Sequence, residues 1–302
     1  MEWNQLQRFL MVAREENLTK AAQQLQVSQP SLSQMIKRLE DELGYTLFVR
    51  EGKRIRLNES GKIFMQTVSQ METMMQNTRI RLEELNGISH PEVSIRFGSA
   101  STILPQLLLY LRERNPQIQY RIYQWQSGSE TKEEDISILA GPVGKEDDQS
   151  RTRTKEKQIL LEEEILLALP REHFLNHKDR LTMADLMQEE FICLNEQWEL
   201  GREISTELNR LLFTPKMTML VDNPNMMREL LKTGLGIAFV PAVSWHSFAG
   251  KEIMLRRVED FQLKRNIYLQ TSASKYLTRE QKECIHGIKE FFNNSVHDNL
   301  WA

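Results

Sequence analysis

Two short helical patterns joined by a turn of two residues are the feature that most constrains the fold of this chain. The turn is Gln26-Val27, and the second pattern covers residues 28–43. Ser28 is placed to cap that helix, and Pro30 lies in its first turn, where the missing N–H of proline removes no hydrogen bond. Helices joined this tightly must cross closely, which predicts a helix-turn-helix. The apolar side chains of the second pattern recur along one stripe: Leu32, Ile36, Leu39 and Leu43.

A further helix precedes this pair and completes a three-helix domain. Its buried stripe is predicted from residues at helical spacing: Leu6, Phe9, Leu10 and Ala13. Thr19 is predicted to cap the short second helix. Residues 1–58 contain nine basic and seven acidic side chains, whereas the whole chain carries a net charge of −3. A basic end on a mildly acidic chain indicates an anionic partner for that end.

The outward face of the third helix carries hydrogen-bonding and basic side chains. At about 100° per residue, Gln34, Lys37 and, less centrally, Arg38 point away from the apolar stripe. The helix also presents free backbone N–H groups and the positive end of its dipole at its N-terminus. Duplex DNA fits both properties, because phosphates can take the helix end and the lysine while Gln and Ser can read base edges.

A β-hairpin is predicted directly after these helices. The stretch "YTLFVREGKRIRLNESG" alternates around a tip at Glu51-Gly52-Lys53, and Gly44 before it ends the third helix. The hairpin is expected to act as a basic wing that touches neighbouring phosphates or the minor groove. The alternative is a small helical domain whose charges are merely solvated, but caps, turn and wing all agree with a DNA-binding domain.

The run "LTKAAQQLQVSQPSLSQMIKRLEDELGYTLFVR", followed by "LNESG", resembles the winged helix-turn-helix of LysR-type transcriptional regulators. Ser31 replaces the alanine or valine common in that family, so a thymine-methyl contact is expected to differ. The resemblance implies that several residues face DNA: Ser28, Gln29, Pro30, Ser31, Ser33, Gln34 and Lys37. It also implies that the wing contacts the DNA backbone, and the full set of candidates adds Thr19, Arg38, Arg50, Lys53 and Arg54.

A strict seven-residue repeat follows in residues 59–89, which are predicted to form a long helix capped by Asn58 and a hinge near Gly87–Pro91. Apolar side chains spaced alternately by four and three residues form the seam of a coiled coil, and such a seam needs a partner helix. The simplest partner is a second copy of the chain, which predicts a dimer and an inverted-repeat-like DNA site. The alternative, a helix lying on its own domain, favours a broader stripe. The seam residues are Phe64, Val68, Met71, Met75, Thr78, Leu82 and Leu85.

Strands and helices alternate in residues 90–302, which is typical of parallel sheets covered by helices. Two α/β lobes are predicted, lobe I from about 90–163 and 264–302 and lobe II from about 164–263. Strands crossing between such lobes form a hinged clamp with a ligand cleft. The charged stretch 145–157 is expected to be a solvated loop.

This region also resembles the LysR effector domain, through "DNPNMMRELLKTGLGIAFVP" and "LTMADLMQEEFI". The resemblance implies a periplasmic-binding-protein-like domain whose first strand–helix turn, here "GSASTILP", lines the cleft. Ser99, Ser101 and Thr102 would suit a small anion there, although capping alone also explains these hydroxyls. Weaker candidates are Asn195, Gln197 and Asn223. The family's helix between the second and third strands is replaced by "QWQSGSETKEED", which has almost nothing to bury beyond Trp125.

Other chemistry finds little support in the sequence. Cys193 and Cys284 lie outside any CxxC spacing, and Cys193 is expected to be a buried, inert thiol. His173 and His177 are four residues apart but lack further ligands at metal-binding spacing. No nucleophile-elbow, phosphate-loop or zinc-protease motif occurs. We therefore predict neither catalysis nor a metal or cofactor, and neither a membrane span nor an export signal.

The sequence thus predicts a multidomain protein: a winged helix-turn-helix domain in residues 1–58, a coiled-coil linker helix and an α/β effector domain. The predicted function is a cytoplasmic bacterial transcriptional regulator whose effector domain senses a small, anionic metabolite. Its expected partners are duplex DNA and a second copy in a dimer or tetramer, with RNA polymerase as a further candidate. The alternative is an α/β binding protein or enzyme that uses its N-terminal domain for assembly, and salt-sensitive retention on DNA distinguishes the two.

Overall fold

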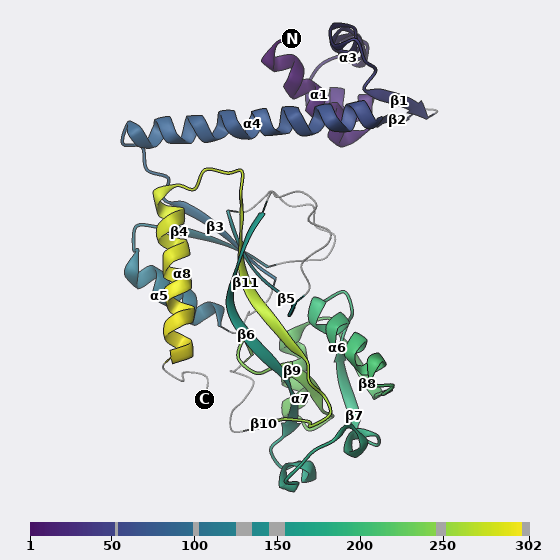
Figure 1. Cartoon of the computed structure of the whole chain (residues 1–302), viewed down its shortest axis with the longest axis vertical. Helices are drawn as coiled ribbons and strands as arrows, with labels where there is room; N and C mark the ends of the chain where they lie inside the picture. The colour runs from purple at the N-terminus through teal and green to yellow at the C-terminus, as the bar shows by residue number, and fades with distance from the viewer. Residues whose placement is uncertain (52–53, 99–102, 125–134, 145–154, 246–251, 298–302) are drawn as a thin grey trace. The chain divides into compact units, whose positions relative to one another are not determined.

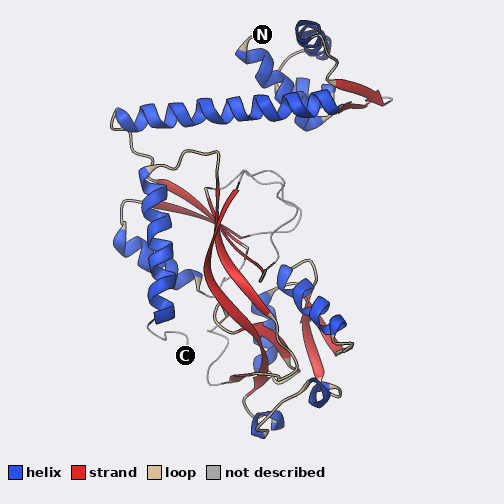
Figure 2. Ribbon diagram, in the orientation of Figure 1, coloured by secondary structure: helices blue, strands red, loops and turns tan. Residues whose placement is uncertain are grey.

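The computed structural model describes all of the chain except residues 52–53, 99–102, 125–134, 145–154, 246–251 and 298–302 (Figures 1 and 2). The chain forms two compact units. Unit 1 contains Met1–Ile88 together with Ser274–Tyr276, and unit 2 contains Ser89–Ala273 together with Leu277–Ala302. Side chains of residues 50–54 and 295–297 also lie outside the described part.

Unit 1 is a three-helix domain with a hairpin and a long helix. Its elements are α1 (Trp3–Glu15), α2 (Leu18–Gln24), α3 (Gln29–Leu43), β1 (Phe48–Glu51), β2 (Arg54–Leu57) and α4 (Glu59–Leu85). Phe9 lies at the centre of the core, because its ring meets Phe64 of α4 edge-on at 4.9 Å and Phe48 of β1 at 5.7 Å. The predicted helix-turn-helix and hairpin are confirmed.

The helix ends follow the predicted capping chemistry with one correction. Ser28 Oγ accepts a hydrogen bond from Ser31 N at 3.3 Å, and Asn58 Oδ1 accepts one from Gly61 N at 2.8 Å. The cap of α2 is Asn17 and not Thr19, because Asn17 Oδ1 accepts from the N–H groups of Thr19 and Lys20. Asparagine caps as well as threonine, and the helix begins at Leu18, two residues earlier than predicted.

Unit 2 consists of two lobes joined by two crossing strands, β6 (Lys155–Pro170) and β11 (Lys264–Ser272). Lobe I contains β3 (Glu92–Phe97), α5 (Leu104–Arg114), β4 (Gln119–Gln124), β5 (Ile136–Pro142) and α8 (Arg279–His297). Lobe II contains β7 (Glu190–Leu194), α6 (Glu199–Arg210), β8 (Lys216–Val221), α7 (Pro224–Lys232), β9 (Ala238–Pro241), β10 (Ile253–Arg256) and the short 3₁₀ helices Phe174–His177 and Met183–Leu186.

The sheet of unit 2 is mixed, which corrects the prediction of a parallel sheet. Strands β3, β4 and β5 pair in parallel, but β11 pairs antiparallel with both β5 and β6, and β9 and β10 pair antiparallel with β6. The predicted return of the last strand and helix to lobe I is confirmed. Residues 155–157, expected in a loop, belong to β6. Their charges gave no strand signal, because this end of β6 is exposed.

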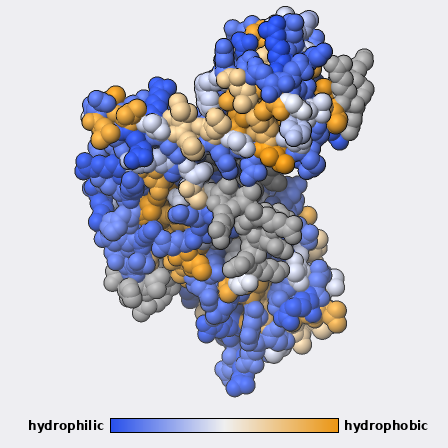
Figure 3. Space-filling model, turned by 45° about the horizontal axis from the view of Figure 1, so that its top comes forward, coloured by the Kyte–Doolittle hydropathy of each residue, from blue (hydrophilic) through white to orange (hydrophobic). Residues whose placement is uncertain are grey.

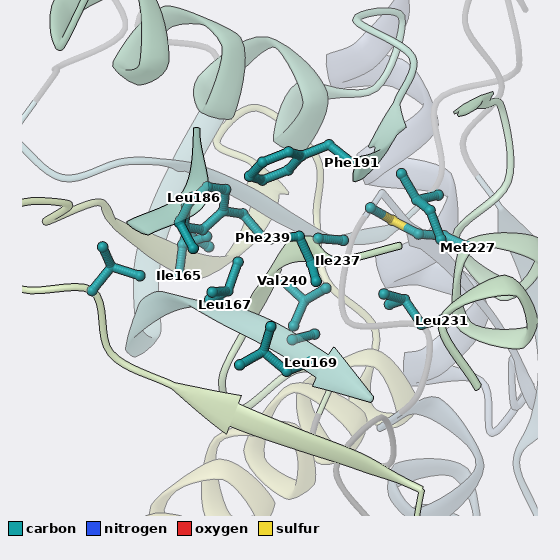
Figure 4. Packing of buried hydrophobic residues seen from close by; sticks show 14 of the residues in the cluster. Ile165, Leu167, Leu169, Leu186, Phe191, Met227, Leu231, Ile237, Phe239 and Val240 are labelled. Carbon is teal, nitrogen blue, oxygen red and sulfur yellow. The ribbon is translucent and has the colours of Figure 1, made fainter. Parts of the chain in front are cut away.

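Each lobe has its own apolar core. In lobe II, Leu167 and Leu169 of β6 pack against Phe191, Leu231 and Phe239 from the surrounding strands and helix (Figure 4). Phe239 also stacks on Phe261, with ring centroids 4.0 Å apart. On the visible face of the molecule, hydrophilic side chains dominate and apolar ones form separate patches (Figure 3). Separate cores allow the lobes to move as bodies about the crossing strands.

Candidate DNA-binding face and ligand cleft

The predicted DNA-contacting residues of α3 lie on one exposed surface. Leu32, Ile36 and Leu39 are buried on the opposite face of the helix and hold it against α1 and α2. Ser33 is half-buried, and Thr19, at the start of α2, is exposed. The exposed residues are Ser28, Gln29, Pro30, Ser31, Gln34, Lys37 and Arg38. Burial of one face therefore leaves the other free for a partner along the first three turns of α3.

A polar hollow of about 230 Å³ runs between α1 and α3. Arg8 from α1 and Ser31, Gln34 and Arg38 from α3 contribute to its lining. The two arginines add positive charge beside the hydrogen-bonding side chains, and this combination suits the phosphate and base edges of a duplex.

The wing is held in place by two glutamates to which the sequence analysis gave no role. Glu40 Oε1, on α3, accepts hydrogen bonds from Leu47 N at 2.6 Å and Phe48 N at 3.2 Å. Glu16 Oε1, after α1, accepts from Leu57 N at 3.4 Å. These two glutamates could have been found as carboxylates able to accept the backbone N–H groups at the ends of the hairpin strands. Lys53 and the side chains of Arg50 and Arg54 lie outside the described part.

The junction between the wing and α4 has no room for a side chain at Gly61. A Cβ atom there would lie 2.1 Å from Leu47 O and 2.7 Å from Leu57 Cδ2. Leu47 O also accepts a hydrogen bond from Asn58 N at 3.0 Å. Gly61 therefore lets the residues at the base of the wing approach the first turn of α4 closely, which holds the hairpin against α4.

Two of the residues predicted for the coiled-coil seam are not available to a partner helix. Val68 is 1% exposed and Phe64 is half-buried, because both pack into the core of their own domain against α1. This corrects their assignment to a dimer seam. The later positions remain exposed, with Met75 at 59% and Leu82 at 55%. A shallow groove of about 330 Å³ lies beside them, lined by Met75, Thr78, Arg79, Leu82, Glu83, Asn86 and Ile88. Exposed seam residues also include Met71 and Leu85.

A narrow cleft of about 30 Å³ lies between the lobes of unit 2. Phe97, Gly98, Gln124 and Ala140 of lobe I form one side, and Arg265 from crossing strand β11 also lines it. Lobe II contributes Leu194, Trp198, Glu199, Leu200, Pro224 and Trp245. Beside this cleft α6 of lobe II contacts β5 of lobe I, and we refer to this arrangement of the lobes as closed.

The predicted effector residues have different positions around this cleft. Ser99, Ser101 and Thr102 lie outside the described part, directly after the cleft residue Gly98. Asn195 and Asn223 use their side chains locally: Asn195 Oδ1 accepts from Gln197 N at 2.9 Å, and Asn223 Oδ1 accepts from Asn225 N at 2.8 Å. Their sequence neighbours Leu194, Trp198 and Pro224 line the cleft instead.

A buried charged cluster, missed by the sequence analysis, lies at the base of the cleft. Arg265 Nε donates to Glu163 Oε1 at 2.8 Å, and a terminal nitrogen of Arg265 donates to Ser244 Oγ at 3.0 Å. Glu163 Oε2 accepts from Ser244 N at 2.7 Å and Val243 N at 3.1 Å. Arg265 is 2% exposed and Glu163 3%. The available signal was one acidic and one basic residue in two otherwise apolar strands. That they are partners becomes clear only from the pairing of β6 with β11.

Glu203 on α6 lies close to this cluster. Neither carboxylate oxygen is exposed to solvent, and neither has a hydrogen-bond partner among the described residues. Burial raises the pKa of Glu203 to about 7, with Arg265 lowering it and Glu199 raising it less strongly.

Cys193 of β7 is half-buried beside an apolar pocket of about 470 Å³ between α6 and the β7–β8 pair. Burial raises the pKa of its thiol to about 11, and burial raises that of Cys284, in the lobe I core, to about 12. Both thiols therefore stay protonated at neutral pH, as expected for inert cysteines.

His173 is bound within lobe II, since its Nε2 lies 3.1 Å from Glu189 Oε2 and its Nδ1 accepts from Leu175 N. Within the described ranges, no three His, Cys, Asp or Glu side chains gather as a metal site would require. No helix in the same ranges combines the length and apolar character that crossing a bilayer demands.

A winged helix-turn-helix joined to a two-lobed ligand-binding domain defines a DNA-binding transcriptional regulator with an effector domain. Residues 3–62 match the family "Bacterial regulatory helix-turn-helix protein, lysR family", and residues 90–293 match "LysR substrate binding domain". The chain belongs to the LysR family of transcriptional regulators, as its sequence resemblance predicted.

Similar proteins agree with this assignment. The uncharacterized HTH-type transcriptional regulator YybE of Bacillus subtilis is 28% identical over 250 residues, covering 80% of this chain and 82% of the relative. A variant of full-length OxyR from Pseudomonas aeruginosa is similar in structure, with a TM-score of 0.60, 21% identity and coverage of 97% and 95% of the two chains. CbnR complexed with its target DNA gives a TM-score of 0.51 and 19% identity, covering 97% and 100%. The likeness to these structures shows the fold.

Proposed function

We propose that this LysR-family regulator reads duplex DNA through α3, with the wing on the neighbouring backbone. The observation that carries this proposal is the exposed row of Ser, Gln and Lys side chains on a helix whose opposite face is fully buried. Base edges in the major groove are read by such donors and acceptors, while Lys37, the wing and the helix N-terminus suit phosphates. The DNA complex of CbnR, which shares the fold, supports the same use of this domain.

Two copies bind one site in this proposal. The exposed strip on α4 from Met71 to Leu85 gives each copy an apolar surface suited to a partner helix. A two-fold pair of recognition helices matches an inverted repeat with half-sites about one helical turn apart. Further pairing of the effector domains would give a tetramer. The protein acts in the cytoplasm, where RNA polymerase is a further partner.

A small anionic metabolite is the proposed effector, bound between the lobes of unit 2. The cleft is lined by both lobes and by Arg265, so a ligand there contacts parts of the domain that move relative to each other. The hydroxyl residues after Gly98, namely Ser99, Ser101 and Thr102, are proposed to bind its acid group. Asn195, Gln197 and Asn223 remain weaker candidates for effector binding. They lie in the loops that also carry the cleft residues Leu194, Trp198 and Pro224.

Footprinting on DNA around the protein's own gene tests this function. The expected result is protection of an inverted repeat, with affinity falling steeply as salt rises because several phosphates are neutralised. A panel of carboxylate metabolites should contain one that alters the footprint and raises the unfolding temperature. Ser101→Ala combined with Thr102→Ala should abolish that response and leave DNA binding intact. Absence of DNA binding at low salt would contradict the proposal.

A further inference from the structure

Glu203 is a buried carboxyl group on a helix that contacts both lobes. It lies on α6 of lobe II, and α6 packs against β5 of lobe I (Figure 1). Glu199, one turn earlier on α6, reaches the same strand: a Cβ atom placed on Gly141 would lie 3.8 Å from its Oε1. The other lobe therefore supplies part of the surroundings of α6 on this side, and we infer that separating the lobes would admit water to Glu203.

The charged groups around Glu203 do not offset the free-energy cost of burying an ionised carboxylate. Arg265 is already bound to Glu163 and Ser244 by hydrogen bonds. Arg202 is exposed, so its charge is screened by solvent. Glu199 and Glu163 add negative charge, and the described strand β5 carries no charged side chain. A carboxylate that finds no hydrogen-bond donor among the described residues is disfavoured in such a place, whereas the neutral acid is tolerated.

We propose that Glu203 takes up a proton when the lobes close, so that closure of the effector domain is linked to pH. A role of this proton in the effector response rests on the proposed function. The link between lobe closure and pH can be measured without a ligand.

The direction of the linkage follows from the pKa in each state. The pKa of Glu203 is about 7 in the closed domain described here, and a hydrated Glu203 has the ordinary value of 4.5. Between these values the closed state holds a proton that the open state lacks. Closure therefore weakens by about tenfold per pH unit as pH rises from about 5 to 7, and is constant above that range. Mild acidification favours the closed arrangement.

The test compares the full-length protein with Glu203→Gln, which imitates the neutral acid, and with Glu203→Leu, which removes the polar group. Glu207→Gln is the matched control, one turn further along α6, where Arg210 lowers the pKa of the carboxyl by a hydrogen bond. Thermal unfolding of the effector domain is measured from pH 5.5 to 8. The advantage of the Gln variant over the wild type should grow by about tenfold in the unfolding equilibrium constant from pH 5.5 to 7. The Leu variant should show the same trend, and the control none.

Hydrogen exchange gives a second measurement at the contact itself. For peptides covering residues 136–142 and 196–205, the exchange rate of the wild type is divided by that of the Gln variant at the same pH. The intrinsic pH dependence of amide exchange cancels in this ratio. This ratio should increase from pH 5.5 to 7.5 for Glu203→Gln and stay near one for Glu207→Gln. A constant difference at every pH, or a Gln variant less stable than wild type at pH 7.5, would overturn the proposal. Failure of DNA binding or of the metabolite response would leave this result unaffected.

Discussion

Replacing Gly61 by alanine should destabilise the DNA-binding domain, although the same change normally strengthens a helix. Alanine gains about 1 kcal/mol over glycine in a helix interior. Here its methyl group would lie 2.1 Å from the backbone oxygen of Leu47 and 2.7 Å from Leu57 Cδ2. Backbone cannot rotate away as a side chain end can, so the wing must shift. Such overpacking costs about 1–3 kcal/mol.

The same shift breaks the hydrogen bond from Asn58 N to Leu47 O, worth about 1 kcal/mol net. After the helix gain is subtracted, we expect a net loss of about 2 kcal/mol, or roughly 10 °C in the unfolding midpoint of a domain this small. Calorimetry of the full-length protein measures it, together with DNA affinity, which should fall because the wing is displaced. Ser60→Ala, exposed on the same helical turn, is the control and should change the midpoint little. A midpoint for Gly61→Ala equal to or above wild type would refute the close-contact argument.

Two further predictions concern the DNA-contacting face and the exposed part of α4. Gln34→Ala should change which DNA sequences are bound, whereas Lys37→Ala should weaken all of them alike and reduce the salt slope by about one; equal losses on every sequence for both variants would contradict the division of roles. The double substitution Met75→Asp and Leu82→Asp should dissociate the dimer, because unpaired charge would be buried between the helices. Light scattering should then give the mass of a monomer. Gln76→Asp, on the exposed helix surface outside the seam, should leave the mass unchanged, and an unchanged mass for the double variant would remove α4 from the interface.

The DNA-binding domain could be predicted from the sequence because its signals are local. The cap at Ser28, the left-handed Gly44 after α3 and the cap at Asn58 each depend on residues within a few positions of one another. The same local logic misplaced the start of α2, where Asn17 and Thr19 are both good caps and only the backbone decides. It also assigned Val68 to a dimer, because a seven-residue repeat does not tell whether the facing helix is α1 of the same chain.

The effector cleft depends on pairings between residues far apart in sequence. The predicted strands are nearly all present, but their antiparallel pairing with β11 joins residues about a hundred positions apart. The carboxyl of Glu163 and the guanidinium of Arg265 become partners only through that register. Glu203 falls on a helix that reads as polar, and the burial of its carboxyl group depends on the tertiary packing around α6. Periodicity predicts which face of an element is apolar but not which other element covers it.

The buried groups at the base of the cleft differ in how they can respond to lobe movement. Glu163 and Arg265 are register neighbours on β6 and β11, the two strands that run through both lobes. Their ion pair can therefore persist when the angle between the lobes changes. Glu203 lies on α6, which contacts β5 of the opposite lobe, and its carboxylate oxygens are buried. If its solvation changes with closure, as we propose, this carboxyl group contributes to the electrostatic free-energy difference between the two states. A ligand that supplied a hydrogen-bond donor to it would stabilise the closed state and weaken its dependence on pH.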